Sequence, residues 1–298
     1  MTSTAEIADR LATVDMQRFH SVISANELLD KLGMEHWRIV DCRFDLMAPE
    51  QGYKDYLAGH IPGAVYASLD RDLSGPVLGN SGRHPLPDPE AFVRTLEAWG
   101  ISNGSQVVAY DYGSGAIAAR LWWMLRWLGH TAVAVLDGGI AAWTGAGGPV
   151  DRFESSRQKA HFKAKPAAAG VLELAELLHK QPGLTLVDAR DRNRFQGLAE
   201  PIDKVAGHIP GARNLPYSEL LTAEGRFLSA EVLRQRLLSV LGAGGTSPWA
   251  AMCGSGVTAC HLALAAEIAG IPAPRLYVGS WSEWIRDPGR PVATGPDR

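Results

Sequence analysis

The chain has 298 residues, 46% of them hydrophobic and 20% charged, which is long enough for two globular domains. Its formal net charge of −3 excludes the strongly basic surface typical of proteins that bind nucleic acid or anionic membranes. Three cysteines, an odd number in a long chain, indicate a reducing compartment rather than a disulfide scaffold, so we expect a cytoplasmic protein.

Residues 1–17 are expected to form a tail ahead of the first domain. They carry Glu6, Asp9 and Asp15 and lack a continuous apolar core, which excludes a secretory signal. No apolar run in the chain approaches the roughly 20 residues that span a bilayer. We therefore expect neither a membrane nor a nucleic acid as a partner.

Apolar runs and capped helical segments alternate along the first half. The helix predicted for residues 24–33 begins at Ser24, which forms a capping box with Glu27. A second predicted helix, residues 88–100, has Asp88 as its N-cap and a proline at its first position. Short apolar runs bounded by turn residues predict buried strands at residues 37–42, 105–111 and 131–139.

The second half repeats the first. The segment "AGHIPGA" occurs at residues 58–64 and again at residues 206–212. Downstream, "YGSGAIA" starting at Tyr112 aligns with "CGSGVTA" starting at Cys253. The same offset holds over more than thirty residues and also pairs the glycines Gly138 and Gly279 and the tryptophans Trp143 and Trp284. A duplicated domain explains this register.

The second half has the same order of elements. Strands are predicted at residues 185–189, 248–253 and 274–280, and a helix at residues 256–270. This alternation predicts an α/β fold of two domains, each a mostly parallel sheet covered by helices on both faces. We expect the domains at residues 18–145 and 170–298, with a linker at residues 146–169, where Gly, Pro, Lys and Ala dominate.

Cys253 lies at the end of a predicted strand, where open α/β sheets bind their ligands. Gly254 and Gly256 let the chain curl, so that backbone amides point inward as an anion-binding nest. The helix that follows adds partial positive charge, and Ser255 and Thr258 add hydroxyl donors. This setting stabilises a thiolate and favours a nucleophile. The alternative is a small buried cysteine in a plain turn.

Other chemistries for this loop lack their residues. Cysteine-dependent phosphatases need an arginine six residues after the cysteine, and Ala259 stands there. The nucleotide-binding pattern GxxxxGK[ST] is absent. The spacing of Cys253, Cys260 and His261 matches no zinc site. We expect neither a metal nor a cofactor.

The motifs together resemble the tandem-domain rhodanese family. They are "CGSGVTAC", two copies of "GHIPGA", "VDAR" and "VLDGGIAAW", and the loop is similar to that of the 3-mercaptopyruvate sulfurtransferases. The resemblance implies a catalytically silent N-terminal domain, with Tyr112 at the cysteine position, and a C-terminal domain that carries sulfur as a persulfide on Cys253. Sulfur would pass from 3-mercaptopyruvate to a thiol acceptor such as thioredoxin, or to cyanide. The alternatives are a thiosulfate sulfurtransferase and a non-catalytic rhodanese-like binding module.

The resemblance also implies site residues. Ser255, His84 and Asp70 would form a proton relay, although His84 could equally be a surface histidine and Asp70 a turn residue. Arg194, and less strongly Arg190, would bind the donor's carboxylate, unless each forms only a surface ion pair. The remaining predicted substrate contacts are the loop residues Gly254, Gly256, Val257 and Thr258.

One position departs from the family pattern. The family commonly has a second arginine after "EP", whereas this chain reads "AEPIDKVAGHIPG" with Lys204 as the only nearby cation. Lysine offers a point charge rather than a planar fork. Neutral Gly254 and Ser255 stand where thiosulfate-preferring relatives have basic residues. Because charges about 4 Å apart attract by roughly 4 kcal/mol near a protein surface, their loss favours mercaptopyruvate over dianionic thiosulfate.

Overall fold

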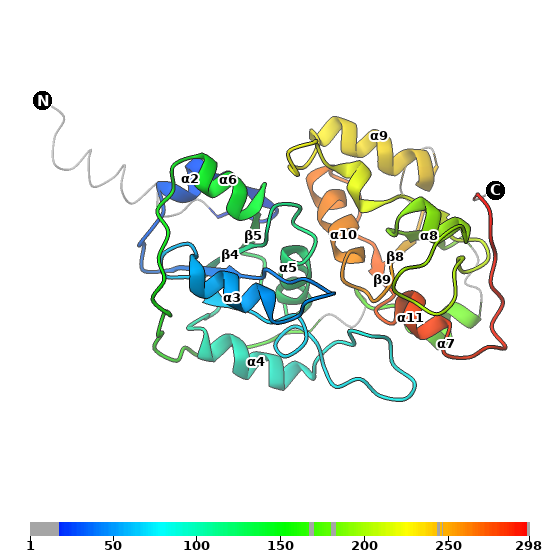
Figure 1. The fold of residues 1–298 in the computed structure, drawn as a ribbon, viewed down its shortest axis with the longest axis horizontal. Helices are drawn as coiled ribbons and strands as arrows, with labels where there is room; N and C mark the ends of the chain where they lie inside the picture. The colour runs from blue at the N-terminus through cyan, green and yellow to red at the C-terminus, as the bar shows by residue number, and fades with distance from the viewer. Residues whose placement is uncertain (1–17, 167–169, 180–182, 243–244, 246, 297–298) are drawn as a thin grey trace, which may run out of the picture.

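The computed structural model describes residues 18–166, 170–179, 183–242, 245 and 247–296. They fold into two α/β halves that lie side by side, each around its own sheet (Figure 1). The strand ladders of both sheets are parallel. The predicted fold class is confirmed.

The N-terminal sheet has five strands in the order β1-β5-β4-β2-β3. Its strands are β1 (Val22–Ile23), β2 (Trp37–Asp41), β3 (Val65–Tyr66), β4 (Gln106–Tyr110) and β5 (Val133–Leu136). Its helices are α2 (Ala25–Leu29), α3 (Gln51–Ala58), α4 (Pro89–Ala98), α5 (Ala118–Trp127) and α6 (Gly139–Gly145).

The C-terminal sheet has four strands in the order β7-β6-β8-β9. Its strands are β6 (Thr185–Asp188), β7 (Arg213–Asn214), β8 (Trp249–Met252) and β9 (Arg275–Leu276). Around it lie α7 (Leu174–Leu178), α8 (Arg192–Gln196), the 3-10 helix η2 (Tyr217–Leu220), α9 (Ala230–Leu241), α10 (Ala259–Ile268) and α11 (Ser280–Trp284).

Side chains of the central strands alternate between two cores, one on each face of the sheet. In β4, Val107 and Ala109 belong to the core that contains α4 and α5, whereas Val108 and Tyr110 belong to the core that contains α2 and α6. The C-terminal sheet is likewise covered by α9 and α10 on one face and by α8 and α11 on the other. Helices therefore cover both faces of each sheet, as predicted.

The N-caps of two helices lie at the predicted residues, whereas two other helix boundaries differ from the prediction. Ser24 and Glu27 form the predicted capping box, and Asp88 caps α4. The first helix ends at Leu29 rather than at residue 33, because the following amides bond three residues back in tighter turns. The helix predicted from residue 256 begins at Ala259, because Gly256 has a φ of +77° and cannot join a right-handed helix.

The two halves share one core. Helices α5 and α10 lie against each other between the sheets (Figure 1), and their buried residues belong to a single hydrophobic cluster. Arg126 on α5 also pairs with Glu267 on α10 at 3.2 Å. Because α10 is apolar on all sides, it is stable only when buried on all sides, which docking of the halves provides.

The predicted linker follows the surface of the N-terminal half up to residue 166. Asp151 pairs with His60 in a β-bridge, Arg157 bonds the carbonyl of Gly63, and Phe162 is buried in the shared core. The domain boundaries themselves stay a prediction, and the tail at residues 1–17 lies outside the described residues. Among the helices that the structure describes, none is long and apolar enough to cross a membrane.

Candidate active site

A cavity of about 400 Å³ lies between the two halves. Both halves supply its lining, which includes Phe44, Leu69, Arg83, His84, Asp111 and Tyr112 from the first, and Arg190, Arg194, Cys253, Gly254, Ser255, Val257 and Thr258 from the second. No group of three metal-ligating side chains is found within the described ranges. The lining brings cysteine, serine, histidine and arginine side chains together in one cavity, whose walls are otherwise mainly apolar.

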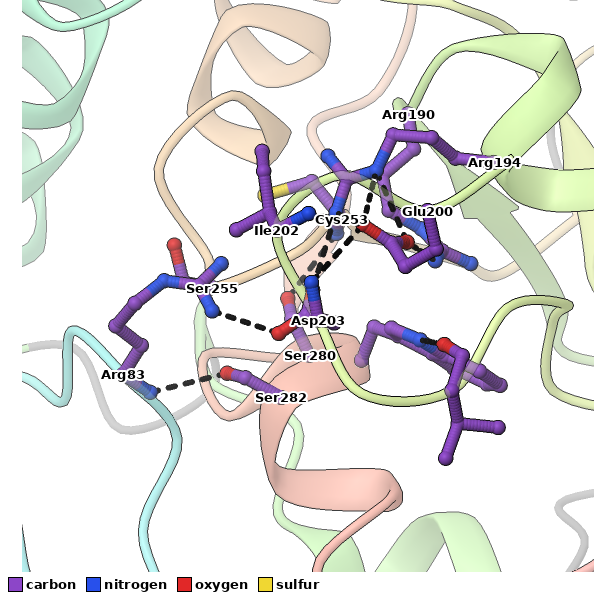
Figure 2. Close-up of polar contacts among 12 residues, drawn as sticks. Arg83, Arg190, Arg194, Glu200, Ile202, Asp203, Cys253, Ser255, Ser280 and Ser282 are labelled. Atoms are coloured by element: carbon purple, nitrogen blue, oxygen red, sulfur yellow. Dashed lines mark hydrogen bonds and ion pairs between the residues drawn. The ribbon is translucent and has the colours of Figure 1, made fainter. Parts of the chain in front are cut away.

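The reactive loop follows β8 and is held by α11. Cys253 is only 2% exposed, and its amide donates to Ser280 Oγ at 3.0 Å. The carbonyls of Cys253 and Gly254 accept from the amides of Trp281 and Ser282. These bonds fix the start of the loop, so the thiol has a defined position at the cavity wall (Figure 2).

The internal repeat shows what the curled loop binds. In the N-terminal copy, the carboxylate of Asp111 accepts from four backbone amides, those of Gly113, Gly115, Ile117 and Ala118, at 2.9 to 3.2 Å. The loop is thus an anion-binding nest that a carboxylate of the same chain fills.

The C-terminal copy has the same frame without that carboxylate. Met252 stands at the position of Asp111, and α5 and α10 each begin six residues after the aligned Tyr112 or Cys253. Gly256 repeats the positive φ of Gly115, at +77° and +72°. No described side chain accepts from the equivalent amides, those of Gly254, Gly256, Thr258 and Ala259, so this nest holds no anion of the described chain.

The predicted relay residues lie together, although they come from distant parts of the chain. His84 Nδ1 is 2.7 Å from Ser255 Oγ, and His84 Nε2 is 3.3 Å from Asp70 Oδ1. Burial, aided by the charges of Arg120 and Arg83, lowers the pKa of His84 to about 3. The imidazole is therefore neutral at neutral pH. With its proton on Nδ1, the ring donates to Ser255 Oγ and leaves the serine hydroxyl free to donate into the cavity, while Nε2 faces Asp70.

The far end of this group reaches the solvent. The Asp70 side chain is 47% exposed, whereas that of His84 is buried. Burial still raises the pKa of the Asp70 carboxyl. A proton could thus pass between the solvent at Asp70 and the hydroxyl of Ser255 inside the cavity.

Arg194 is presented to the cavity by two carboxylates. Its Nε donates to Glu200 at 2.9 Å, and its Nη2 lies 3.0 Å from Asp203 Oδ2. Burial raises the pKa of Glu200, but hydrogen bonds from Arg194 and from the amides of Asp203 and Ile202 outweigh it and lower the pKa overall. The loop after Arg194 is therefore closed around an ionised Glu200.

The contacts of Arg190 are those of a residue that supports the fold. It forms a two-pronged ion pair with Asp188 at 2.6 Å and bonds a backbone carbonyl, and its side chain is 1% exposed. Arg43 and Asp41 make the same pair at 2.6 Å in the N-terminal copy. Because the N-terminal half keeps this pair although it has Tyr112 at the position of the cysteine, the pair supports the fold of each half. A role for Arg190 in donor binding stays a prediction.

Lys204 does not line the cavity and is exposed. The turn that precedes Lys204 explains this orientation. The amides of Ile202 and Asp203 both donate to Glu200, which folds this segment into a turn. Asp203 then points inward, with its side chain 5% exposed, and Lys204 points outward. The predicted substrate contact of Lys204 has no support in this geometry.

Two arginines of the N-terminal half were missed by the sequence reasoning. Arg83 lines the cavity next to His84. Arg120 is fully buried in α5 and donates to the carbonyls of His84 and Gly256 at 3.1 and 3.2 Å, tying the histidine segment to the reactive loop. A signal for Arg120 was present, since it is a charged residue within an otherwise apolar run. Arg83 gave none beyond its place beside His84.

Comparison with known proteins explains this arrangement. A model of the rhodanese-like domain matches residues 24–146 and again residues 171–287. The chain belongs to the rhodanese family. The resemblance noted in the sequence is thereby confirmed, as is the presence of two rhodanese domains.

Full-length rhodaneses are similar over most of the chain. A protein of Pseudomonas aeruginosa described as "Probable 3-mercaptopyruvate sulfurtransferase" is 50% identical over 278 residues, 92% of this chain and 98% of the relative. Thiosulfate sulfurtransferase of Bos taurus is 35% identical over 258 residues, 83% of this chain and 84% of that one. The structure of 3-mercaptopyruvate sulfurtransferase from Leishmania major matches with a TM-score of 0.80 at 35% identity, over 89% of this chain and 74% of that chain.

Proposed function

We propose that this rhodanese is a sulfurtransferase that moves sulfur from 3-mercaptopyruvate, through a persulfide on Cys253, to a thiol acceptor. One observation carries the proposal. The loop around Cys253 repeats a nest that binds the Asp111 carboxylate in the other half, and here the nest has no internal anion. Four amides that hold a carboxylate can hold the negative charge of a thiolate or a persulfide.

The first half-reaction forms the persulfide. The Cys253 thiolate attacks the donor's sulfur, an S–S bond forms, and the C–S bond breaks with its electron pair left on carbon. The resulting enolate takes a proton from the Ser255 hydroxyl, giving pyruvate. Ser255 regains a proton from Nδ1 of His84, and Nε2 of the ring takes up a proton in turn from the side of Asp70, which it faces at 3.3 Å with the solvent beyond.

The second half-reaction returns the enzyme to its starting state. An acceptor thiolate attacks the outer sulfur of the persulfide, and the S–S bond breaks with its electron pair returning to Cys253. The same amides stabilise the leaving thiolate. The proposed acceptor is thioredoxin or another thiol, with cyanide as an assay substitute. Free, buried cysteines without a disulfide among the described residues support a reducing compartment, and we propose the cytoplasm.

Thiosulfate is the alternative donor, and the bovine relative supports it. Its transfer breaks an S–S bond and leaves sulfite, so no carbon needs a proton. The contact of His84 with Ser255, at 2.7 Å, has a use only with 3-mercaptopyruvate and favours that donor. A non-catalytic binding module is the third reading, and the free Cys253 thiol at the cavity opposes it.

Mass spectrometry tests the proposal. After incubation with 3-mercaptopyruvate, the protein should gain one sulfur atom on the peptide that contains Cys253. Cys253→Ser should gain none, whereas Cys42→Ser, a change at a fully buried cysteine, should load normally. No adduct with either donor would favour a binding module. A kcat/KM for thiosulfate equal to or above that for 3-mercaptopyruvate would favour the alternative enzyme.

A further inference from the structure

Ser280, the first residue of α11, has an unusual backbone conformation. Its φ is +53°, and among the residues that the structure describes it is the one non-glycine residue with a positive φ. This left-handed region is unfavourable for a residue with a side chain, because the Cβ crowds the neighbouring carbonyl oxygen. Such strain persists only where the surrounding contacts hold it in place, and it is often found at functional sites. The contacts of Ser280 are therefore a guide to its role.

The Ser280 hydroxyl links the reactive loop to the residue after β9. Its Oγ accepts from the amide of Cys253 at 3.0 Å (Figure 2). The same hydroxyl donates to the carbonyl of Tyr277 at 2.8 Å, which fixes the direction of its proton and turns a lone pair toward Cys253. Ser280 is fully buried, so loss of the hydroxyl would leave the Cys253 amide without this acceptor in the interior, which is unfavourable.

The internal repeat has a glycine at this position. Gly139, one residue after the aligned glycines of the two halves, begins α6 with a φ of +55°. A Cβ built on Gly139 would lie 2.4 Å from the carbonyl oxygen of Asp111, so the N-terminal half has no room for a side chain there. Both halves need the same backbone conformation, and glycine adopts it without strain. Only the half that carries Cys253 places a hydroxyl at this point, and the backbone conformation alone does not explain it.

The hydrogen bond to Ser280 fixes the direction of the Cys253 side chain. The amide of Cys253 belongs to the peptide plane before its Cα, and this amide is held by Ser280. The carbonyl of Cys253 belongs to the plane after its Cα and accepts from the amide of Trp281 at 3.0 Å. With both planes bonded to α11, the Cα–Cβ bond that carries the thiol to the cavity has one direction. A nucleophile depends on such placement, since a shift of about 1 Å can slow a reaction about 100-fold.

We infer that Ser280 is a positioning residue for Cys253, whose hydroxyl holds the cysteine backbone so that the thiol meets donor and acceptor at a fixed place. The inference rests on the proposed function. Ser280 does not line the cavity, so its hydroxyl acts on the rate at which Cys253 reacts and not on donor affinity. The effect is the same for 3-mercaptopyruvate and thiosulfate, because both donors react with the same thiol. Ser255, by contrast, serves only the donor that leaves a carbanion.

Two variants separate the hydroxyl from the strain. Ser280→Ala removes the hydroxyl but keeps a Cβ in the left-handed region, whereas Ser280→Gly removes both. In denaturant titrations Ser280→Ala should therefore be the less stable of the two. Both should nevertheless lower kcat about 10- to 100-fold with either donor, with KM within about twofold. A loss of kcat that is equal in two variants of unequal stability is not explained by a structural role of the side chain.

Ser105→Ala is the matched control. Ser105 is also buried, and its Oγ accepts from the amide of Ser102 at 3.0 Å within the N-terminal half. Its loss should lower the free energy of unfolding, because a buried amide loses its acceptor. The kcat with both donors should stay at the value of the parent.

Alkylation by iodoacetamide measures the reactivity of Cys253 without any sulfur donor, and fragment masses of the loop peptide locate the adduct. Its rate should fall in both Ser280 variants by a factor similar to the fall in kcat. Parental kcat and alkylation rate in Ser280→Gly would overturn the inference, and so would a loss confined to Ser280→Ala, since the strain and not the hydroxyl would then be responsible. If Ser280→Ala fails to fold, Ser280→Gly decides alone.

The alkylation rate also separates this inference from the proposed function. A parent protein that gains no sulfur from either donor would refute the proposed function. A slower alkylation of Cys253 in both Ser280 variants would still support the positioning role, because iodoacetamide reacts with the thiol whatever the natural substrate is.

Discussion

Lowering the pH should destabilise the protein through His84. Burial lowers the pKa of this histidine from 6.5 to about 3 in the folded protein, whereas the unfolded chain titrates near 6.5. Below pH 6.5, His84 is therefore protonated in the unfolded state but stays neutral in the folded state. This contribution to stability is therefore present above pH 6.5 and is lost as the pH falls toward 3.

The size of the effect at a given pH depends on how far that pH lies below 6.5, down to the folded pKa of about 3. Each pH unit below 6.5 costs about 1.4 kcal/mol, so about 2 kcal/mol is lost at about pH 5. Other groups titrate in this range too, so the measurement compares the parent with His84→Gln. Guanidinium titrations at about pH 7.5 and pH 5 give the free energy of unfolding of each protein, and the difference between the two pH values is the stability that each protein loses.

We expect the parent to lose about 2 kcal/mol more than His84→Gln between these pH values. Equal losses would show that His84 accepts a proton in the folded state. The neutral relay between Ser255 and Asp70 would then be refuted. A titration of the histidine ring protons by NMR, assigned with the same variant, gives an independent reading if the variant unfolds at low pH.

Three more predictions follow from the site. Ser255→Ala should lower kcat/KM about 100-fold or more with 3-mercaptopyruvate and much less with thiosulfate, since only the first donor leaves a carbon that needs a proton; parallel losses would contradict the relay. Gly256→Ala should cost well over 1 kcal/mol of unfolding free energy, because its φ is +77° and the new Cβ would lie 2.4 Å from a backbone carbonyl. Gly270→Ala, with a φ of +63° but open space around it, is the control and should cost less in the same denaturant titration. Asp111→Ala should destabilise by at least about 2 kcal/mol, because four amides lose their acceptor, while sulfur loading of Cys253 persists in the mass assay.

The duplication, the main strands and the reactive loop could be predicted from the sequence because they depend on neighbours in the chain. The apolar run "WAAM", bounded by turn residues, forms the buried strand β8, and Ser24 caps its helix with a residue three positions away. Cys253 stood out for the same reason, since a strand end followed by glycines is a local pattern. The relay of His84 with Ser255 was expected only from the family resemblance.

Contacts between distant segments were decided by the tertiary structure alone. Lys204 and Asp203 are neighbours in the sequence, yet only Asp203 points inward, because two amides of its turn bond to Glu200. Arg83 reaches Asp203, 120 residues later, only because the two halves dock along α5 and α10. No periodicity or spacing encodes such a meeting, since it depends on how two separately folded surfaces fit together.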